Sequence, residues 1–194
     1  MKVVLSHEMS DIEERAERLG ISRDQLMESS GLAVADLIVS EIGNLEGIRV
    51  VALIGSGNNG SDGLIACSYL MRRGAKVTAA ILSKRSDPDF KLRDAETFGV
   101  DAFVVDKVPD GLSYLLKAAA RSHVLVDAVL GTGLSREIVD PLKTVLEKVS
   151  EVISSDALVV AVDLPSGLDS DGDTSYRPLL VPSITVALGY PKLI

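Results

Sequence analysis

Short apolar runs alternate along this chain with longer segments in which apolar residues recur every three or four positions. Runs of four to eight β-branched and aliphatic residues are typical of buried parallel strands, whereas the longer spacing is typical of helices packed on one side. Polar segments rich in Gly, Pro, Asp and Ser separate the two kinds. The pattern predicts strands at residues 49–54, 76–82, 102–105, 123–130, 157–162 and 183–188, with helices at 64–73, 90–98, 110–120 and 141–152.

Two further helices are predicted before the first strand. Ser10-Asp-Ile-Glu13 and Ser22-Arg-Asp-Gln25 both have the form of a capping box, in which two side chains satisfy the first free N–H groups of a helix. The first box opens a short helix that stops near Gly20, and the second opens a longer helix that ends at Gly43-Asn44. Within the longer helix, Ser29-Ser-Gly31 forms a small polar turn that either packs closely against a neighbour or faces a ligand.

The alternation of strands and helices predicts a single domain of the α/β class over residues 1–194. We expect a three-layer α/β/α, Rossmann-like fold with a mainly parallel, doubly wound sheet, and the two extra N-terminal helices packed outside its first strand. If the strand order is 3-2-1-4-5-6, the first, fourth and fifth strands are neighbours. The loops that follow these strands then meet in one crevice at the carboxyl edge of the sheet.

Composition narrows the classes of partner and compartment. Apolar residues make up 46% of the chain and aromatic residues only 4%, so the core should be aliphatic. A net charge of −8 argues against binding to nucleic acid or to an anionic membrane, and no apolar run approaches the ~20 residues of a membrane span. The single cysteine, Cys67, fits a reducing compartment, and with two distant histidines it makes a zinc site improbable. We expect a cytoplasmic protein.

The loops after the first, fourth and fifth strands are the most polar and glycine-rich in the chain. They are residues 55–63, 127–137 and 163–171. Their expected convergence predicts a shared small-molecule site. Simpler interpretations stay open: the first loop can be a turn whose Asn and Gly residues accept positive φ, and Asp127 and Asp163 can cap the elements that follow them.

The first loop also matches a dinucleotide-binding fingerprint. Gly55-Ser-Gly57-Asn-Asn-Gly60 follows a strand and precedes a helix, as that motif requires. However, Asp62 stands where the helix N-terminus should receive a pyrophosphate, and its charge would repel the ligand. The second strand ends without an acidic residue for a ribose diol, although Lys84 and Arg85 suit a 2′-phosphate. An NADP-dependent oxidoreductase is therefore a minor alternative.

Five motifs together resemble the NAD(P)H-hydrate epimerases, the YjeF N-terminal domain, over nearly the whole chain. They are Leu26–Gly31, Gly57–Gly63, Asp127–Arg136, Val162–Asp169 and Gly189–Lys192. The resemblance implies a homodimer that interconverts the R and S forms of hydrated NADH or NADPH, in which C6 of the nicotinamide ring carries a hydroxyl. It also implies a functional partner, an NAD(P)H-hydrate dehydratase. Many microbes fuse this enzyme to the C-terminus of the domain, and we expect it to be a separate protein here.

Carried over position by position, the resemblance implies the residues of the site. The substrate would contact Asn58, Asn59, Gly60, Ser61, Asp62, Gly131, Thr132, Gly133, Leu134, Ser135, Arg136, Glu137 and Asp163. A potassium ion would bind Asn59, Asp127 and Ser166. The residue types agree with this assignment, because amide, carboxylate and hydroxyl oxygens are hard donors that suit a hard cation.

Inversion at C6 proceeds by loss and re-addition of water or by ring opening and reclosure, and both routes require a proton shuttle. We assign this role to Asp163, which ends a central strand, and consider Lys192 a second catalytic candidate that polarises the leaving oxygen or holds phosphate. A solvated Lys192 is the simpler reading. A non-catalytic binding or scaffold module of the same fold is the alternative function, but the presence of Asn59, Asp127, Asp163 and Ser166 favours the enzyme.

Two positions depart from the resemblance. Ser61 stands where the family usually has Gly, so it narrows the approach to the ligand or supplies a helix cap. Ser29 stands where the family often has Asn, which weakens an amide contact expected from the second helix.

Overall fold

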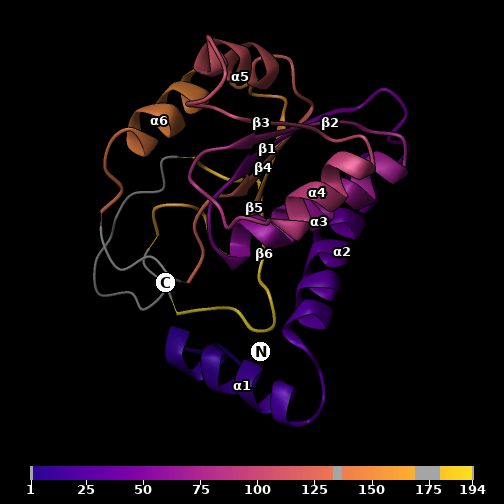
Figure 1. The fold of residues 1–194 in the computed structure, drawn as a ribbon, viewed down its shortest axis with the longest axis vertical. Coiled ribbons are helices and arrows are strands. Elements are labelled where there is room, and N and C mark those ends of the chain that lie inside the picture. Colours follow the sequence, from indigo (N-terminus) through magenta and orange to yellow (C-terminus); the bar gives the residue numbers. More distant parts are fainter. Residues whose placement is uncertain (1, 133–136, 169–179, 194) are drawn as a thin grey trace.

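The computed structural model describes residues 2–132, 137–168 and 180–193. In these ranges, parallel strands form one six-stranded sheet in the order β3-β2-β1-β4-β5-β6 (Figure 1). The strands are β1 Arg49–Ile54, β2 Lys76–Ile81, β3 Asp101–Val104, β4 Val124–Ala128, β5 Leu158–Val162 and β6 Ile184–Val186. The predicted order 3-2-1-4-5-6 and the Rossmann-like α/β class are confirmed.

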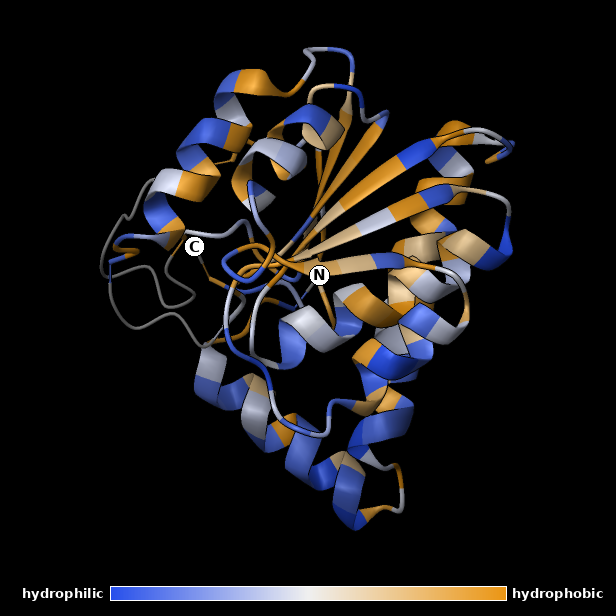
Figure 2. Cartoon of the chain, turned by 45° about the horizontal axis from the view of Figure 1, so that its top comes forward, coloured by the Kyte–Doolittle hydropathy of each residue, from blue (hydrophilic) through white to orange (hydrophobic). Residues whose placement is uncertain are grey.

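Helices cover both faces of the sheet. They are α1 Ser6–Arg18, α2 Arg23–Ile42, α3 Asn58–Arg72, α4 Phe90–Thr97, α5 Gly111–Ala119 and α6 Leu142–Val152. Side chains of α2, α3 and α4 pack in one core with Val50, Ala52 and Ile54 of β1, whereas α5 and α6 pack in a second core with Val51 and Leu53. This alternation produces the apolar strands between amphipathic helices that Figure 2 shows in orange and blue.

The two N-terminal helices differ in how they pack. α2 lies along α3 and contributes Val34, Ala35 and Ile38 to the core. α1 has no buried side chain and lies apart from both helical layers (Figure 1). The expectation that both helices pack outside the first strand is therefore wrong for α1. The residues just before α1 instead contact the C-terminal segment, where the backbone N–H of Val4 donates to the carbonyl of Pro191 at 2.9 Å.

One of the two predicted capping boxes is confirmed. The Ser22 Oγ accepts from the Gln25 N–H at 3.2 Å, and the Gln25 side chain accepts from the Ser22 N–H at 2.8 Å. The box at Ser10 is wrong, because α1 begins one turn earlier. Glu8 accepts from the Leu5 N–H at 2.9 Å, and Ser10 lies inside the helix.

The register of the strands brings the ends of β1, β4 and β5 to one edge. Leu53 of β1 pairs with Asp127 of β4, and Asp127 pairs with Ala161 of β5. Asp163 directly follows the last residue of β5, at the same edge of the sheet as Asp127. Loops from three distant parts of the chain therefore begin side by side. Within the described ranges, no helix combines the length and hydropathy required to cross a membrane.

Candidate functional site

The glycine-rich segment after β1 is mostly helix. The prediction placed a loop up to Gly63 and a helix from Leu64, but α3 already begins at Asn58. Gly60 and Gly63 explain the early start of α3, because a side chain at either position would collide with neighbouring backbone or methyl groups. A Cβ on Gly60 would lie 2.2 Å from the Gly55 carbonyl oxygen, and one on Gly63 would lie 2.4 Å from the Ala128 Cβ. The first turns of α3 therefore lie directly against the carboxyl edge of the sheet.

Asn59 lies at the centre of this edge. Its side chain is buried, and neither its Oδ1 nor its Nδ2 has a hydrogen-bond partner within the described part of the chain. A Cβ on Gly131 would lie 3.3 Å from the Asn59 Cγ and 3.2 Å from Asp163 Oδ2. The loops after β1, β4 and β5 thus meet at one point, and a buried polar side chain without a partner is an unusual feature that indicates a ligand.

Asp127 and Ser166 hold two of these loops together. Asp127 is buried, and its carboxylate accepts from the Ser166 Oγ at 2.6 Å, the Ser166 N–H at 2.8 Å and the Val129 N–H at 3.3 Å. Ser166 Oγ in turn accepts from the Leu130 N–H at 2.9 Å. Burial raises the pKa of Asp127, and the hydrogen bonds from Ser166 and Val129 oppose that rise.

Asp163 forms a buried ion pair with Lys192. The Lys192 Nζ donates to Asp163 Oδ1, and also to the Leu188 carbonyl at 2.8 Å. Both residues are buried, with exposed fractions of 7% and 6%. The backbone of Asp163 has φ of +65°, in the left-handed region that Asp and Asn tolerate better than most residues and that is enriched at functional sites. Lys192 is therefore part of the site rather than a solvated lysine.

A second carboxyl, that of Asp62, lies buried on α3 near this pair. Burial raises the pKa of Asp62 to about 7, the negative charges of Asp163 and Glu13 add to the rise, and the charge of Lys192 opposes it. Glu13 comes from α1, and partial desolvation together with the charge of Asp163 raises its pKa, against the charge of Lys192. Charges from four distant segments therefore act on one another at this edge.

Other predicted substrate-binding residues lie around this centre. Asn58 is exposed, Gly60 is buried, and Gly131 and Thr132 are half-buried at the mouth of the loop after β4. Glu137 is exposed, with its carboxylate 3.9 Å from the Lys143 Nζ. Four further predicted residues lie outside the described ranges: Gly133, Leu134, Ser135 and Arg136.

Two participants were not among the predicted site residues, although Arg85 was noted as a group that suits a 2′-phosphate. Arg85, after β2, donates to the Gly55 carbonyl, to Ser61 Oγ at 2.9 Å and to Asp89 at 2.5 Å. It therefore binds the first loop, and Ser61 serves as its acceptor. Glu13 was considered only as part of a capping box. In neither case does the local sequence carry a signal, because each contact joins segments that are far apart along the chain.

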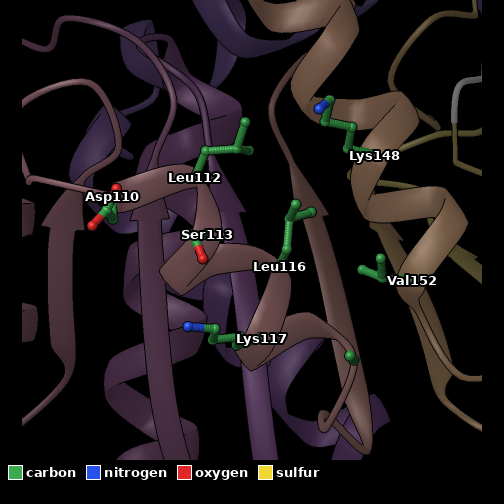
Figure 3. Close-up of a pocket in the computed structure, with 8 residues that line it drawn as sticks. Asp110, Leu112, Ser113, Leu116, Lys117, Lys148 and Val152 are labelled. Carbon is green, nitrogen blue, oxygen red and sulfur yellow. The ribbon is translucent and has the colours of Figure 1, made fainter.

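A separate apolar groove lies between α5 and α6 (Figure 3). Its volume is about 550 Å³, and Leu112, Leu116 and Val152 face one another across it, with Lys117 and Lys148 nearby. None of its lining residues belongs to the predicted site. The groove is therefore distinct from the convergence of loops at the carboxyl edge.

Fold and site together define a Rossmann-like α/β domain that holds a polar site where the strand order reverses. Residues 23–194 match the family described as YjeF-related protein N-terminus, and the chain belongs to this family. It is 37% identical to a bifunctional NAD(P)H-hydrate repair enzyme of Thermofilum pendens, over all of this chain and 36% of that protein. It is 30% identical to an NAD(P)H-hydrate epimerase of Elusimicrobium minutum, over 99% of this chain and 87% of that one.

A solved structure agrees with this assignment. The yeast protein ynu0 (YNL200c) superposes with a TM-score of 0.84 at 27% identity, over 99% of this chain and 82% of the yeast chain. The chain thus spans about a third of its bifunctional relative and most of the length of the single-function relative and the yeast protein.

Proposed function

We propose that this protein is an epimerase that interconverts the R and S forms of hydrated NADH and NADPH in the repair of nicotinamide cofactors. Relatives that are 30% identical over most of both chains are named NAD(P)H-hydrate epimerase. The observation that carries the proposal is the meeting of Asn59, Gly131 and the Asp163–Lys192 pair at one buried edge. A substrate at this edge reaches a carboxylate, a cation and an amide that has no hydrogen-bond partner within the described ranges.

The proposed chemistry uses Asp163 and Lys192. Epimerisation moves a proton to the C6 hydroxyl as it leaves and removes one from the water that returns. The contact with Lys192 holds one oxygen of the Asp163 carboxylate and leaves the other, Oδ2, beside Gly131, where it can meet a ligand. Lys192 donates hydrogen bonds to two acceptors, so its ammonium group has a fixed position from which it orients the Asp163 carboxylate.

We further propose that potassium binds at Asn59, Asp127 and Ser166. The residues fit such an ion because the Asn59 oxygen is buried and has no hydrogen-bond partner in the described ranges, and Asp127 and Ser166 lie on the loops that meet it. One carboxylate with neutral oxygen donors suits a monovalent hard cation. Within the described residues no group of three or more His, Cys, Asp or Glu side chains forms a multivalent metal site. A bound cation would offset negative charge near an anionic dinucleotide.

Potassium should therefore stabilise the folded protein. We expect the melting temperature to be several degrees higher in potassium chloride than in choline chloride at equal ionic strength, because a ligand at about 100 times its Kd adds about 2.7 kcal/mol. The variant Asn59→Ala should lose this difference, since it removes the free oxygen. Equal melting temperatures of the natural protein in both salts would contradict the potassium proposal.

Replacing Asp163 tests the proposed function itself. Asp163→Asn should abolish R/S interconversion while retaining substrate affinity, and Asn also tolerates the left-handed backbone. Because this change leaves the Lys192 charge buried and unpaired, its fold must be verified by circular dichroism. The double variant Asp163→Asn, Lys192→Met removes both charges and serves as the second test. Interconversion that survives in either folded variant would refute the role of Asp163.

The repair reaction requires a second enzyme. Two relatives are named bifunctional NAD(P)H-hydrate repair enzyme, and we propose that an NAD(P)H-hydrate dehydratase consumes the S form produced here. The single cysteine supports a cytosolic location, which we also propose.

A further inference from the structure

Three aspartates are buried at the carboxyl edge of the sheet, and their surroundings differ. Asp127 accepts three hydrogen bonds, and Asp163 is paired with Lys192. Asp62 is 6% exposed, and among the described residues its carboxyl has neither a hydrogen-bond donor nor an ion-pair partner. A buried carboxyl with no partner favours its neutral form, which can donate a proton.

Asp62 also lies on the same face of α3 as Asn59. It lies three residues after Asn59 on α3, so the two side chains share one face of the helix, and both are buried. Asn58 lies exposed on another face of the helix, and Ser61 is turned to Arg85. The buried amide of Asn59 lies beside Gly131 and has no hydrogen-bond partner among the described residues, so it independently marks this face as one that meets a ligand.

We propose that Asp62 is the second proton-transfer residue of the site, donating a proton to the C6 hydroxyl as it leaves while Asp163 accepts one from the entering water. This inference rests on the epimerase function proposed above. It assigns the two directions of proton transfer to carboxyls on two different elements, α3 and the loop after β5.

The step balances as follows on the substrate. The C6–O bond breaks with its electron pair on oxygen, which takes the Asp62 proton and leaves as water, while the N1 lone pair forms an N1=C6 double bond. A water molecule then adds to C6, the N1=C6 pair returns to nitrogen, and the extra proton of that water passes to Asp163. Exchange with solvent returns the proton to Asp62. The cationic ring that exists between the loss and the addition of water is stabilised by the carboxylates beside it.

The surroundings of the two carboxyls differ. Burial and the charges of Asp163 and Glu13 raise the pKa of Asp62 to about 7, against the charge of Lys192. Asp163, in contrast, is in direct contact with the Lys192 ammonium group. The charged groups that face Asp62 are Glu13 on α1, Asp163 after β5 and Lys192 in the final segment. A carboxyl with a raised pKa can serve as a general acid near neutral pH.

The test compares Asp62→Asn with Asp156→Asn, a matched change at an exposed aspartate before β5. In the first variant we expect kcat to fall by about 100-fold or more with KM changed by less than about threefold, the loss typical of a general acid. In the natural protein kcat/KM should fall as pH rises through about 7, because Asp62 must carry a proton in the active form of the enzyme. The residual activity of Asp62→Asn should lack this fall, and Asp156→Asn should retain both rate and profile.

The following results decide the proposal. A kcat above about a third of the natural value in Asp62→Asn, or an unchanged alkaline fall, would overturn it. A natural protein with no interconversion would refute the proposed epimerase, and the role of Asp62 with it. In a protein that is active, carbon-13 NMR titration of the Asp62 carboxyl gives a readout besides rate: a midpoint near 7 supports the role, and one near the ordinary 4 overturns it.

Discussion

At the scale of single residues, Asp62 links stability to pH. Its pKa is about 7 in the folded protein and near 4 when unfolded, so between these values the folded state binds more protons than the unfolded state. Stability therefore decreases as pH rises from about 4 to about 7, by about 1.4 kcal/mol for each unit of separation. This cost arises from the burial of the Asp62 carboxyl and from the negative charges of Asp163 and Glu13.

Asp62→Asn should remove that dependence. We expect the variant to be more stable than the natural protein at pH 8 and to differ less from it at pH 5, as measured by urea unfolding at both values. The exposed Asp156→Asn change serves as the reference. A natural protein whose stability relative to Asp62→Asn is the same at both values would show that Asp62 ionises normally.

Ser166 should matter for stability as well as for potassium. Its hydroxyl contacts the Asp127 carboxylate at 2.6 Å and accepts from the Leu130 N–H at 2.9 Å. Ser166→Ala removes both bonds and leaves a buried donor, so we expect a loss of about 1–3 kcal/mol in the free energy of unfolding. Ser154→Ala, at an exposed turn, is the control, and an equal effect of the two changes would contradict this role.

Some residue-scale features were predictable and others were not. Asp163 directly follows an apolar run and Asp127 interrupts one near its end, so both were assigned to the ends of central strands. The strand order brings their loops together. The pairing of Asp163 with Lys192 and the influence of Glu13 depend on contacts between segments far apart in the chain. No periodicity in the local sequence encodes such contacts.

At the scale of elements, α3 depends on its glycines. Gly63→Ala should destabilise the protein by at least about 1–3 kcal/mol, because the new methyl would lie 2.4 Å from the Ala128 Cβ and 3.0 Å from the Ile54 Cδ1. Gly57→Ala, where a Cβ meets nothing within 4 Å, should cost much less. Denaturant unfolding measures both, and adding Ala128→Gly to Gly63→Ala should recover part of the loss. Equal costs at the two glycines would contradict the close approach.

The start of α3 shows why element boundaries were harder to predict than element types. Four glycines and two asparagines between 55 and 63 favour a loop by intrinsic propensity. Packing against β1 and β4 overrides that propensity, because only glycine allows the helix to approach so closely. The strands, by contrast, lie where the apolar runs predicted them, since burial on both faces produces that pattern directly.

At the scale of the whole molecule, the order of the described strands places β6 at one edge of the sheet. Val181, just before β6, is exposed. Edge strands offer unpaired backbone groups to a second chain, and the family resemblance implies a homodimer. We expect light scattering to give twice the 20.5 kDa of one chain. A mass of one chain at micromolar concentration would contradict a dimer.

The central claim is that one buried site inverts C6 of a hydrated nicotinamide cofactor. The most direct measurement supplies R-hydrated NADPH to a dehydratase that acts only on the S form and follows NADPH by its absorbance. Adding this protein should lead to full recovery of NADPH, at a rate proportional to its concentration. If NADPH recovery is no faster than with the dehydratase alone, the protein does not catalyse this epimerisation.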